Sequence, residues 1–545
     1  MQRFCVVIAL LLLAAAVPAG PANPGTATTH DPVYRSVRRL ALATGGSPPS
    51  AVSPISFAEL ESVLRNLDVD RLSEQELEEY REVLRFVSAE PPETPDGTVA
   101  VVSTVELYLH SSDEQDEWLY WYPDRRPLLS IPFRVYPASG LGITADLDWR
   151  KNYPVYPGYE STYTTVAPDP MSNVFGDLRE TDVQFPFQAM LTAAGTSWSV
   201  QFGRSRIGWG LGHDGSLLLS DHVDYHDFFM ASLFGKVASY RGLYLDLEPW
   251  LNGGGTDPDR VYLGHRVELR PVPWLTLAAN EALVFHGKPI ELRYLNPLVI
   301  LHSWFIPQYG NSMINLEASV RPLGGLEVWG HLAIDQIQSA IEEDRGYADS
   351  EPEAMGYLAG AAYTLPVREA WLTVGTEWSY LDPWMYIGRD LLGGFSYRRR
   401  VQAENVLPNG AKVIVEKSLG YPYGPDYYGV TGFAELEAAG DYRFTLDVGF
   451  HAKGENDVGR VLPPVDEPDA ARVTPSGPAP EFVASARLTA DGTFLETELW
   501  GIPIRLSGGA VLDVVRVLNN DHQSGVILWD AQFSPSISLT TVLVR

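Results

Sequence analysis

From residue 98 to the end of this 545-residue chain, apolar and polar side chains alternate with a period of two, and this pattern most constrains the fold. It is clearest in residues 442–453 and recurs in residues 240–248 and 261–270. Successive side chains of a β-strand point to opposite faces of the sheet. The sequence therefore predicts a long all-β region whose strands have one apolar face and one ionic face.

Two architectures can bury such an apolar face. In a soluble sandwich it packs on a second sheet. In a transmembrane β-barrel it meets lipid, as we expect for Leu243, Leu245 and Leu247, while the ionic face lines the lumen. Aromatic residues near strand ends favour the barrel, because they suit the membrane interface; they are Trp250, Trp274, Trp304, Trp384 and Trp500. At about 25 residues per strand and loop, we expect an antiparallel barrel of about 16 to 20 strands, with 18 favoured.

The charge and hydropathy of the chain exclude other classes. Lys and Arg number 40 against 69 Asp and Glu, which gives a net charge of −29, so phosphate backbones would repel the protein and no nucleic-acid partner is expected. A mean hydropathy of −0.08 argues against a bundle of membrane-spanning helices.

The first twenty residues have the pattern of a signal peptide. Arg3 is followed by an apolar stretch over residues 5–17 and by the small-residue sequence Val17-Pro18-Ala19. Cys5 is the only cysteine of the chain and lies inside this leader. The mature protein is therefore expected to have no disulfide and no cysteine nucleophile, as suits a bacterial envelope protein stabilised by a large closed sheet.

Residues 31–91 predict a small periplasmic helical bundle. Ser56 with Glu59, and Ser73 with Glu76, have the spacing of capping boxes at two helix starts, and residues 34–43 predict a third helix. A proline-rich linker over residues 91–97 then leads to the barrel domain, residues 98–545. Within that domain the dipeptide at residues 491–492 (DG) predicts a tight hairpin.

No group of residues predicts catalysis. His222 and His226 lie four residues apart among several aspartates, but no glutamate base lies between them, and we predict a polar loop and no metal site. The glycines of residues 208–212 lack the context of a dinucleotide site, and no nucleophile elbow is present. We therefore expect no enzyme activity and no cofactor. The run Arg398-Arg399-Arg400 is open to two interpretations, a solvated loop or lumen wall, or a contact with an acidic glycan.

Several short motifs resemble, in order, those of the capsule assembly protein Wzi family. They are residues 203–204 (GR), 208–212 (GWGLG), 217–221 (LLLSD), 264–268 (GHRVE), 280–281 (NE), 293–298 (RYLNPL), 330–335 (GHLAID) and 419–426 (LGYPYGPD). The resemblance implies an outer-membrane barrel that binds surface or capsular polysaccharide in the manner of a lectin. Its expected partners are this polysaccharide and outer-membrane lipid, and we expect a monomer.

Six charged positions inside these motifs are candidate ligand-binding residues: Arg204, Arg266, Glu268, Glu281, Arg293 and Asp335. Two roles remain open for them. They form ion pairs that brace the barrel across its lumen, or some of them contact a saccharide. Two other functions also remain open for the whole chain, a porin-like channel and a soluble secreted protein.

Overall fold

The structure is a computed structural model. It describes residues 22–88, 96–111, 118–120, 122, 124–152, 171–182, 186–248, 259–287, 294, 296, 310–336, 352–402, 412–438, 441–463 and 473–544. The expected signal peptide, residues 1–20, lies outside these ranges.

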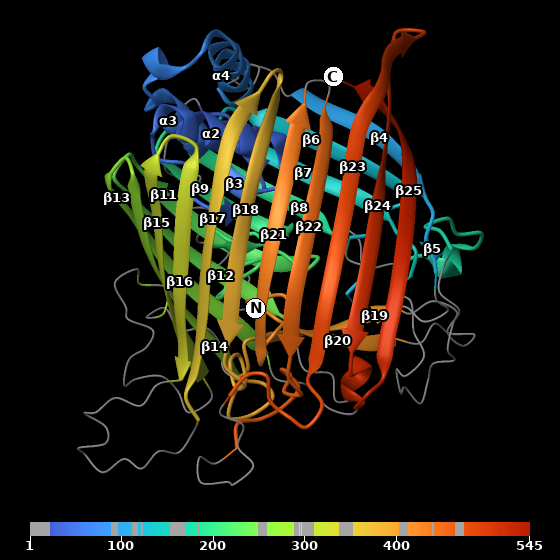
Figure 1. Cartoon of the computed structure of the whole chain (residues 1–545). Helices are drawn as coiled ribbons and strands as arrows, with labels where there is room; N and C mark the ends of the chain where they lie inside the picture. Colours follow the sequence, from blue (N-terminus) through green and yellow to red (C-terminus); the bar gives the residue numbers. More distant parts are fainter. Residues whose placement is uncertain are drawn as a thin grey trace.

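The alternating region forms one closed antiparallel barrel of 18 strands, which confirms the predicted fold class (Figure 1). Segments β4 and β5 belong to one wall strand, since both pair with β25, and β25 closes the barrel between β24 and β4. The wall segments are β4 (Asp96–Glu106), β5 (Leu109–His110), β6 (Leu129–Ala138), β7 (Leu141–Trp149), β8 (Gln188–Gly195), β9 (Trp198–Ser205), β11 (His226–Phe234), β12 (Ala238–Leu247), β13 (Arg260–Val272), β14 (Leu275–His286), β15 (Gly310–Leu323), β16 (Leu326–Gln336), β17 (Ala354–Val367), β18 (Ala370–Leu381), β21 (Tyr427–Ala438), β22 (Tyr442–Lys453), β23 (Glu481–Leu499), β24 (Ile502–Leu518) and β25 (Ile527–Val544).

The two rims of the barrel differ in their connections. At one rim short turns join the strands, as between β8 and β9 or between β17 and β18. At the other rim the connections are long, and two of them span residues 206–225 and 382–426. We call these ends the short-turn rim and the long-connection rim. Helices α2 (Pro32–Thr44), α3 (Phe57–Arg65) and α4 (Glu74–Val87) lie at the short-turn rim, at the top of Figure 1.

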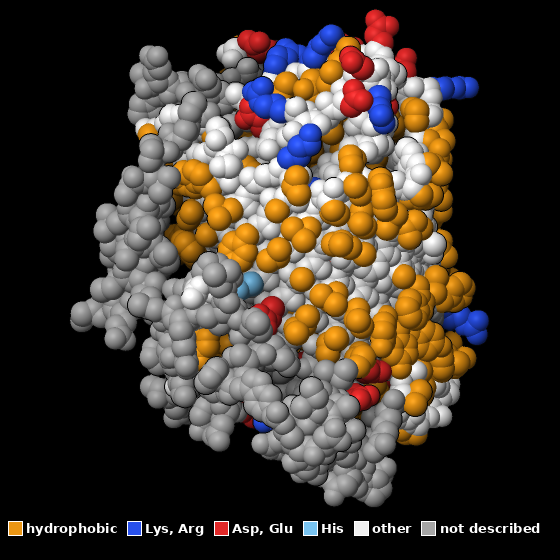
Figure 2. All heavy atoms as spheres, turned by 90° about the vertical axis from the view of Figure 1, so that its left-hand side faces the viewer, with side chains coloured by type: hydrophobic (Ala, Val, Ile, Leu, Met, Phe, Trp, Pro, Cys, Tyr) orange, Lys and Arg blue, Asp and Glu red, His pale blue; other side chains and the backbone are white. Residues whose placement is uncertain are grey.

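The outer surface of the wall is apolar. On β22, whose bounds match the predicted strand, Phe444, Leu446, Val448 and Phe450 are 44%, 43%, 42% and 66% exposed. Figure 2 shows the same on the face at the left of Figure 1, where hydrophobic side chains cover the middle of the wall and charged ones gather at the upper rim. A closed barrel with such a surface leaves no backbone edge in hydrocarbon, so it suits the bacterial outer membrane.

Among the helices that the structure describes, none has the length and apolar character needed to span a bilayer.

The leucines on β12 were predicted to face lipid, but they point into the lumen. Leu243, Leu245 and Leu247 are 4%, 0% and 1% exposed and belong to the same core cluster as Trp209 and Leu217. The lumen at this level is filled by other segments of the chain, so it provides an apolar environment where a porin would have water. Alternation by itself does not distinguish these two environments.

The predicted hairpin at Asp491 and Gly492 is also wrong, because β23 continues through both residues to Leu499. Asp491 accepts a hydrogen bond from Arg126. A Cβ on Gly492 would lie 2.2 Å from Cδ1 of Tyr442, so the glycine permits a close approach of that ring and does not mark a turn. The turn lies at residues 500–501, both with positive φ.

The two helix starts predicted from capping boxes are confirmed, with one difference, and the third predicted helix, residues 34–43, is α2, which begins at Pro32. Ser73 and Glu76 form a complete capping box at the start of α4. At the start of α3, Ser56 accepts a hydrogen bond from the Glu59 amide, but the Glu59 carboxylate does not return to the Ser56 amide. It binds Arg241 on β12 instead, because the helix start is buried against the wall.

The predicted aromatic girdle is present in part. Trp274 and Trp500 are 51% and 90% exposed at the short-turn rim. Trp384, in contrast, is 6% exposed and packs with Ala354 and Ile387, because the connection that carries it folds inward.

Candidate functional site

The N-terminal segment enters the lumen from the short-turn rim and binds the wall through ion pairs. Arg38 of α2 pairs with Glu327 of β16, and Arg39 pairs with Glu437 of β21. Behind the helix, strand β2 (Val52–Ser53) pairs with β10 (Gly208–Trp209), which comes from the opposite rim. These contacts reach several sides of the barrel, so the segment spans the lumen.

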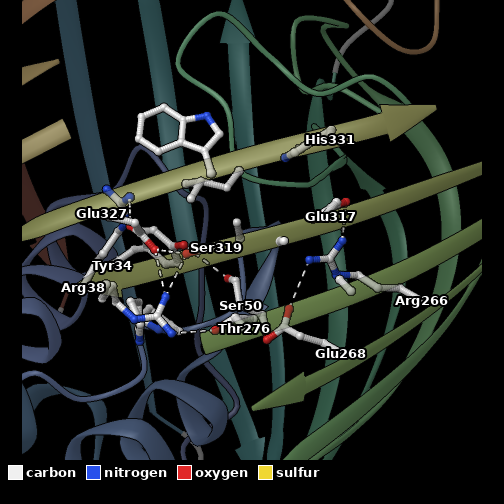
Figure 3. Close-up of a pocket in the computed structure, with 18 residues that line it drawn as sticks. Tyr34, Arg38, Ser50, Arg266, Glu268, Thr276, Glu317, Ser319, Glu327 and His331 are labelled. Atoms are coloured by element: carbon white, nitrogen blue, oxygen red, sulfur yellow. Dashed lines mark hydrogen bonds and ion pairs between the residues drawn. The ribbon is translucent and has the colours of Figure 1, made fainter. Parts of the chain in front are cut away.

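A network of charged side chains lines the contact between this segment and the wall, which we call the interior seam (Figure 3). Arg266 donates to Glu317 at 2.8 Å and to Glu268 at 3.1 Å, and Glu268 also binds Ser50 and Arg270. All these side chains are less than a tenth exposed. Because each buried charge has a partner of opposite sign, the network can remain ionised away from water.

The long connections fill the other half of the lumen. Glu377 of β18 accepts hydrogen bonds from the amides of His213 and Asp214 at 2.8 and 3.1 Å. Asp335 of β16 accepts from the Tyr386 amide at 2.6 Å, and Arg260 of β13 donates to the carbonyl oxygens of residues 392, 394 and 396. Inward-facing wall residues therefore hold both connections inside the barrel.

The space left in this interior is small. The cavity of the interior seam has a volume of about 40 Å³, which is room for one or two water molecules. In the part of the lumen that the structure describes, we find packed side chains where a channel would need a continuous aqueous path.

A second cluster lies at the long-connection rim, where β9, β11 and β12 meet β19 (Ser396–Gln402); we call it the rim recess. The Tyr225 ring lies between two guanidinium groups, that of Arg204 at 4.1 Å and that of Arg399 at 3.5 Å from its centroid. Arg204 binds Asp227 through two hydrogen bonds of 2.8 and 2.7 Å, and Arg399 binds Glu248 at 2.8 Å.

The rim recess is accessible to solvent, and its two arginines are each paired with a carboxylate. The side chains of Arg204, Asp227 and Glu248 are 25%, 48% and 31% exposed, whereas Tyr225 and Arg399 are buried. Each of the two arginines has a carboxylate partner. The recess thus combines planar hydrogen-bonding groups with a rigid aromatic support, which is the chemistry that recognises sugar hydroxyls.

The structure separates the six candidate residues predicted from the sequence. Arg204 belongs to the rim recess, and Arg266 and Glu268 belong to the interior seam, where they pair with each other. Asp335 holds the connection 382–426, and Glu281 is half-buried on β14 directly across from His265 on β13. Arg293 lies outside the described residues.

Sequence reasoning missed Tyr225, Asp227 and Glu248. The arginine run at residues 398–400 was a usable signal, because Arg399 joins the rim recess while Arg398 pairs with Glu416. Tyr225 and Glu248 had no such signal, because they lie in different connections and are brought together by the register of the β11–β12 hairpin, which pairs Asp227 with Asp246. Neither His222 nor His226 joins two further metal-binding groups among the described residues.

One contact between the N-terminal segment and the long connections depends on pH. His30 donates to Asp221 at 2.9 Å, and this hydrogen bond raises the pKa of His30 above 6.5. Burial pushes the pKa of Asp221 upward, but the hydrogen bond and charge of His30 outweigh it and lower the pKa to about 2.

We expect this contact to be strongest between pH 3.8 and 6.5, the ordinary pKa values of the two groups. The contribution of His30 is lost as pH rises through its raised pKa, and that of Asp221 is lost as pH falls towards 2. The effect will be small, since His30 is 70% exposed. Proteolysis of the N-terminal segment should quicken from pH 6 to pH 8.5 in the natural chain and much less in a His30→Gln variant.

Comparison with solved structures identifies the fold. The structure superposes on Wzi, an outer-membrane protein involved in group 1 capsule assembly in Escherichia coli, with a TM-score of 0.56, covering 95% of this chain and 99% of the other at 13% identity. The chain has a Wzi-like fold. Wzi is a carbohydrate-binding β-barrel. The resemblance seen in the sequence is therefore confirmed at the level of the fold, and the Wzi-like barrel is an outer-membrane barrel.

Other barrels are more distant. Pseudomonas aeruginosa OccK8 (OprE) matches with a TM-score of 0.41 at 8% identity, covering 83% of this chain and 98% of its own. Pseudomonas aeruginosa OprD matches with a TM-score of 0.37 at 10% identity, covering 83% and 96%. No family model matches the sequence, and no curated protein sequence matches it.

Proposed function

We propose that this Wzi-like barrel binds a surface polysaccharide at the rim recess and takes part in the assembly or attachment of a capsule or similar coat. The observation that carries the proposal is the recess itself, in which Tyr225 is fixed between two arginines whose carboxylate partners are accessible. The carbohydrate binding of Wzi, which has the same fold, supports the assignment.

The orientation of the barrel agrees with this role. Outer-membrane barrels commonly have short turns on the periplasmic side and longer loops outside the cell. By this rule the rim recess faces the cell exterior, where a surface polysaccharide lies, and the helical region 31–91 faces the periplasm. The proposal includes a monomer without enzyme activity or cofactor.

The test is a binding measurement with polysaccharide extracted from the surface of the host cell. Replacing Arg204 by alanine removes one side of the Tyr225 sandwich and leaves Asp227 without its partner. We expect affinity to fall about tenfold, which corresponds to about 1.4 kcal/mol. Arg505→Ala, an exposed arginine at the opposite rim that also pairs with carboxylates, is the matched control and should bind like the natural chain. Equal affinity of all three proteins would reject the recess as the site.

The porin-like alternative predicts a different result. A channel needs a continuous aqueous path, whereas the described N-terminal segment and long connections pack against the wall inside the lumen. We expect purified protein in planar bilayers to give no stable conductance steps. Regular steps from the heat-modifiable, folded protein would favour the channel.

A further inference from the structure

The hairpin of β23 and β24 extends beyond its neighbour at the short-turn rim. Arg443 near the start of β22 faces Asp491, and β23 continues for eight more residues to Leu499 without a pairing strand on that side among the described residues. On the other side β24 pairs with β25 from Ile504 onward. In Figure 1 the hairpin reaches the highest point of the barrel, at the upper right.

The extended part has two chemically different faces. The register places Leu495 across from Leu506, and Leu499 across from Ile502, on one face. The large apolar side chains near the tip are open to the surroundings: Phe494 is 61% exposed, Leu495 51%, Leu499 45%, Trp500 90% and Ile502 40%. The other face has Glu496, Glu498 and Arg505, of which Arg505 pairs with Glu496 at 2.7 Å.

The apolar face is continuous with the membrane-facing wall. In the same two strands Leu488, Leu512 and Leu518 are outward-facing and 44%, 40% and 39% exposed. On β24 the pleat brings every second residue to the same face, so Leu518, Leu512, Leu506 and Ile502 form one apolar column that runs to the tip. On β23 the register shift between Thr493 and Leu495 brings Leu495 and Leu499 to the face of Leu488. A tryptophan at the end of such a column is the usual anchor at a membrane interface.

The free edge of β23 is poorly suited to pairing with a strand of another protein. A register shift between Thr493 and Leu495 interrupts the edge, and Glu496 and Glu498 place charges along it. Bulges and charged side chains are the features by which proteins prevent edge pairing. The edge therefore argues against a partner strand, while the apolar face points to lipid.

We propose that the β23–β24 hairpin is a membrane-contacting arm whose apolar face, tipped by Trp500, lies in the headgroup region of the leaflet next to the short-turn rim. The charged face with Glu496, Glu498 and Arg505 remains in water. An arm on one side of the barrel fixes the rotation and tilt of the wall relative to the bilayer. This inference rests on the membrane location and is independent of polysaccharide binding.

The experiment uses single thiols, because Cys5 is the only cysteine of the chain and lies in the expected leader. Trp500→Cys and Glu498→Cys are each made with Cys5→Ala, labelled with a polarity-sensitive fluorophore and reconstituted into vesicles of phosphatidylethanolamine and phosphatidylglycerol. Lipid carrying a nitroxide near the headgroup reports contact with the bilayer, and iodide reports contact with water. Heat-modifiable mobility verifies that each variant is folded.

We expect the label at position 500 to be quenched by the nitroxide lipid at least threefold more than the label at position 498, with iodide giving the reverse order. If both labels are quenched equally by iodide and neither by the lipid, the arm stands in water and the proposal is overturned. Protection of both labels from both quenchers would indicate a protein partner and would overturn it as well.

Discussion

Replacing Glu59 by alanine is expected to loosen the docking of the helical region by about 3–5 kcal/mol while the barrel stays closed. Glu59 at the start of α3 binds Arg241 of β12, and the two side chains are 4% and 1% exposed. Its removal leaves a buried guanidinium without this carboxylate. The loss of docking free energy is large because the buried Arg241 guanidinium cannot be solvated by water.

The effect is measurable as faster proteolysis of residues 31–88 in detergent, by about two orders of magnitude or more. Glu61→Ala is a matched control two residues away on the same helix. Glu61 pairs with Arg65, whose side chain is 60% exposed, so this change should cost less than about 1 kcal/mol. Replacing both Glu59 and Arg241 by methionine should restore much of the protection, since neither charge then remains buried.

If Glu59→Ala and Glu61→Ala are cleaved at the same rate, the buried ion pair does not hold the helices, and the apolar contacts of Leu60 and Leu64 must do so alone.

Replacing Asp426 by alanine is expected to release the connection between β22 and β23 from the rest of the long-connection rim. The buried carboxylate accepts hydrogen bonds from the amide of Ser476 at 2.9 Å, from the amide of Asn456 at 3.2 Å and from the Ser476 hydroxyl. Each donor left unsatisfied in a buried site costs about 1–3 kcal/mol. Three donors share this one carboxylate, so the loss should be several kcal/mol.

Cleavage between β22 and β23 and hydrogen exchange of the amides of residues 454–456 and 476 give the measurement. Asp457→Ala is the control, because Asp457 is exposed and its carboxylate accepts from the neighbouring amide of Val458. Asp426→Asn keeps one carbonyl oxygen and should be intermediate. Unchanged exchange in Asp426→Ala would show that the connection is held by other contacts.

Asp426 also shows that recognising a motif does not predict what its residues do in the structure. It is the last residue of the run at 419–426 that resembles the Wzi family, yet it was absent from the candidate ligand residues. Its backbone has a φ of +54°, and a Cβ on Gly454 would lie 1.9 Å from its carboxylate. The run therefore serves to turn the chain and to hold two further segments in place.

The sequence by itself determined the all-β class of the fold, because the alternation of apolar and polar residues shows which side chains lie on each face of a strand. The bounds of β22 and the starts of α3 and α4 followed from periods and caps that involve only nearby residues, and a strand number within 16 to 20 followed from the length of the alternating region. These signals are local, so no tertiary information was needed to read them.

Only the tertiary structure decided what the inward-facing side chains of each wall strand contact. Leu243 and Arg241 are two residues apart on β12, and both face segments that enter the lumen from opposite rims. The same is true of the rim recess, where Tyr225, Glu248 and Arg399 come from three separate connections. Such contacts depend on strand register and barrel closure, and a period of two is the same whether the facing surface is water, lipid or another part of the chain.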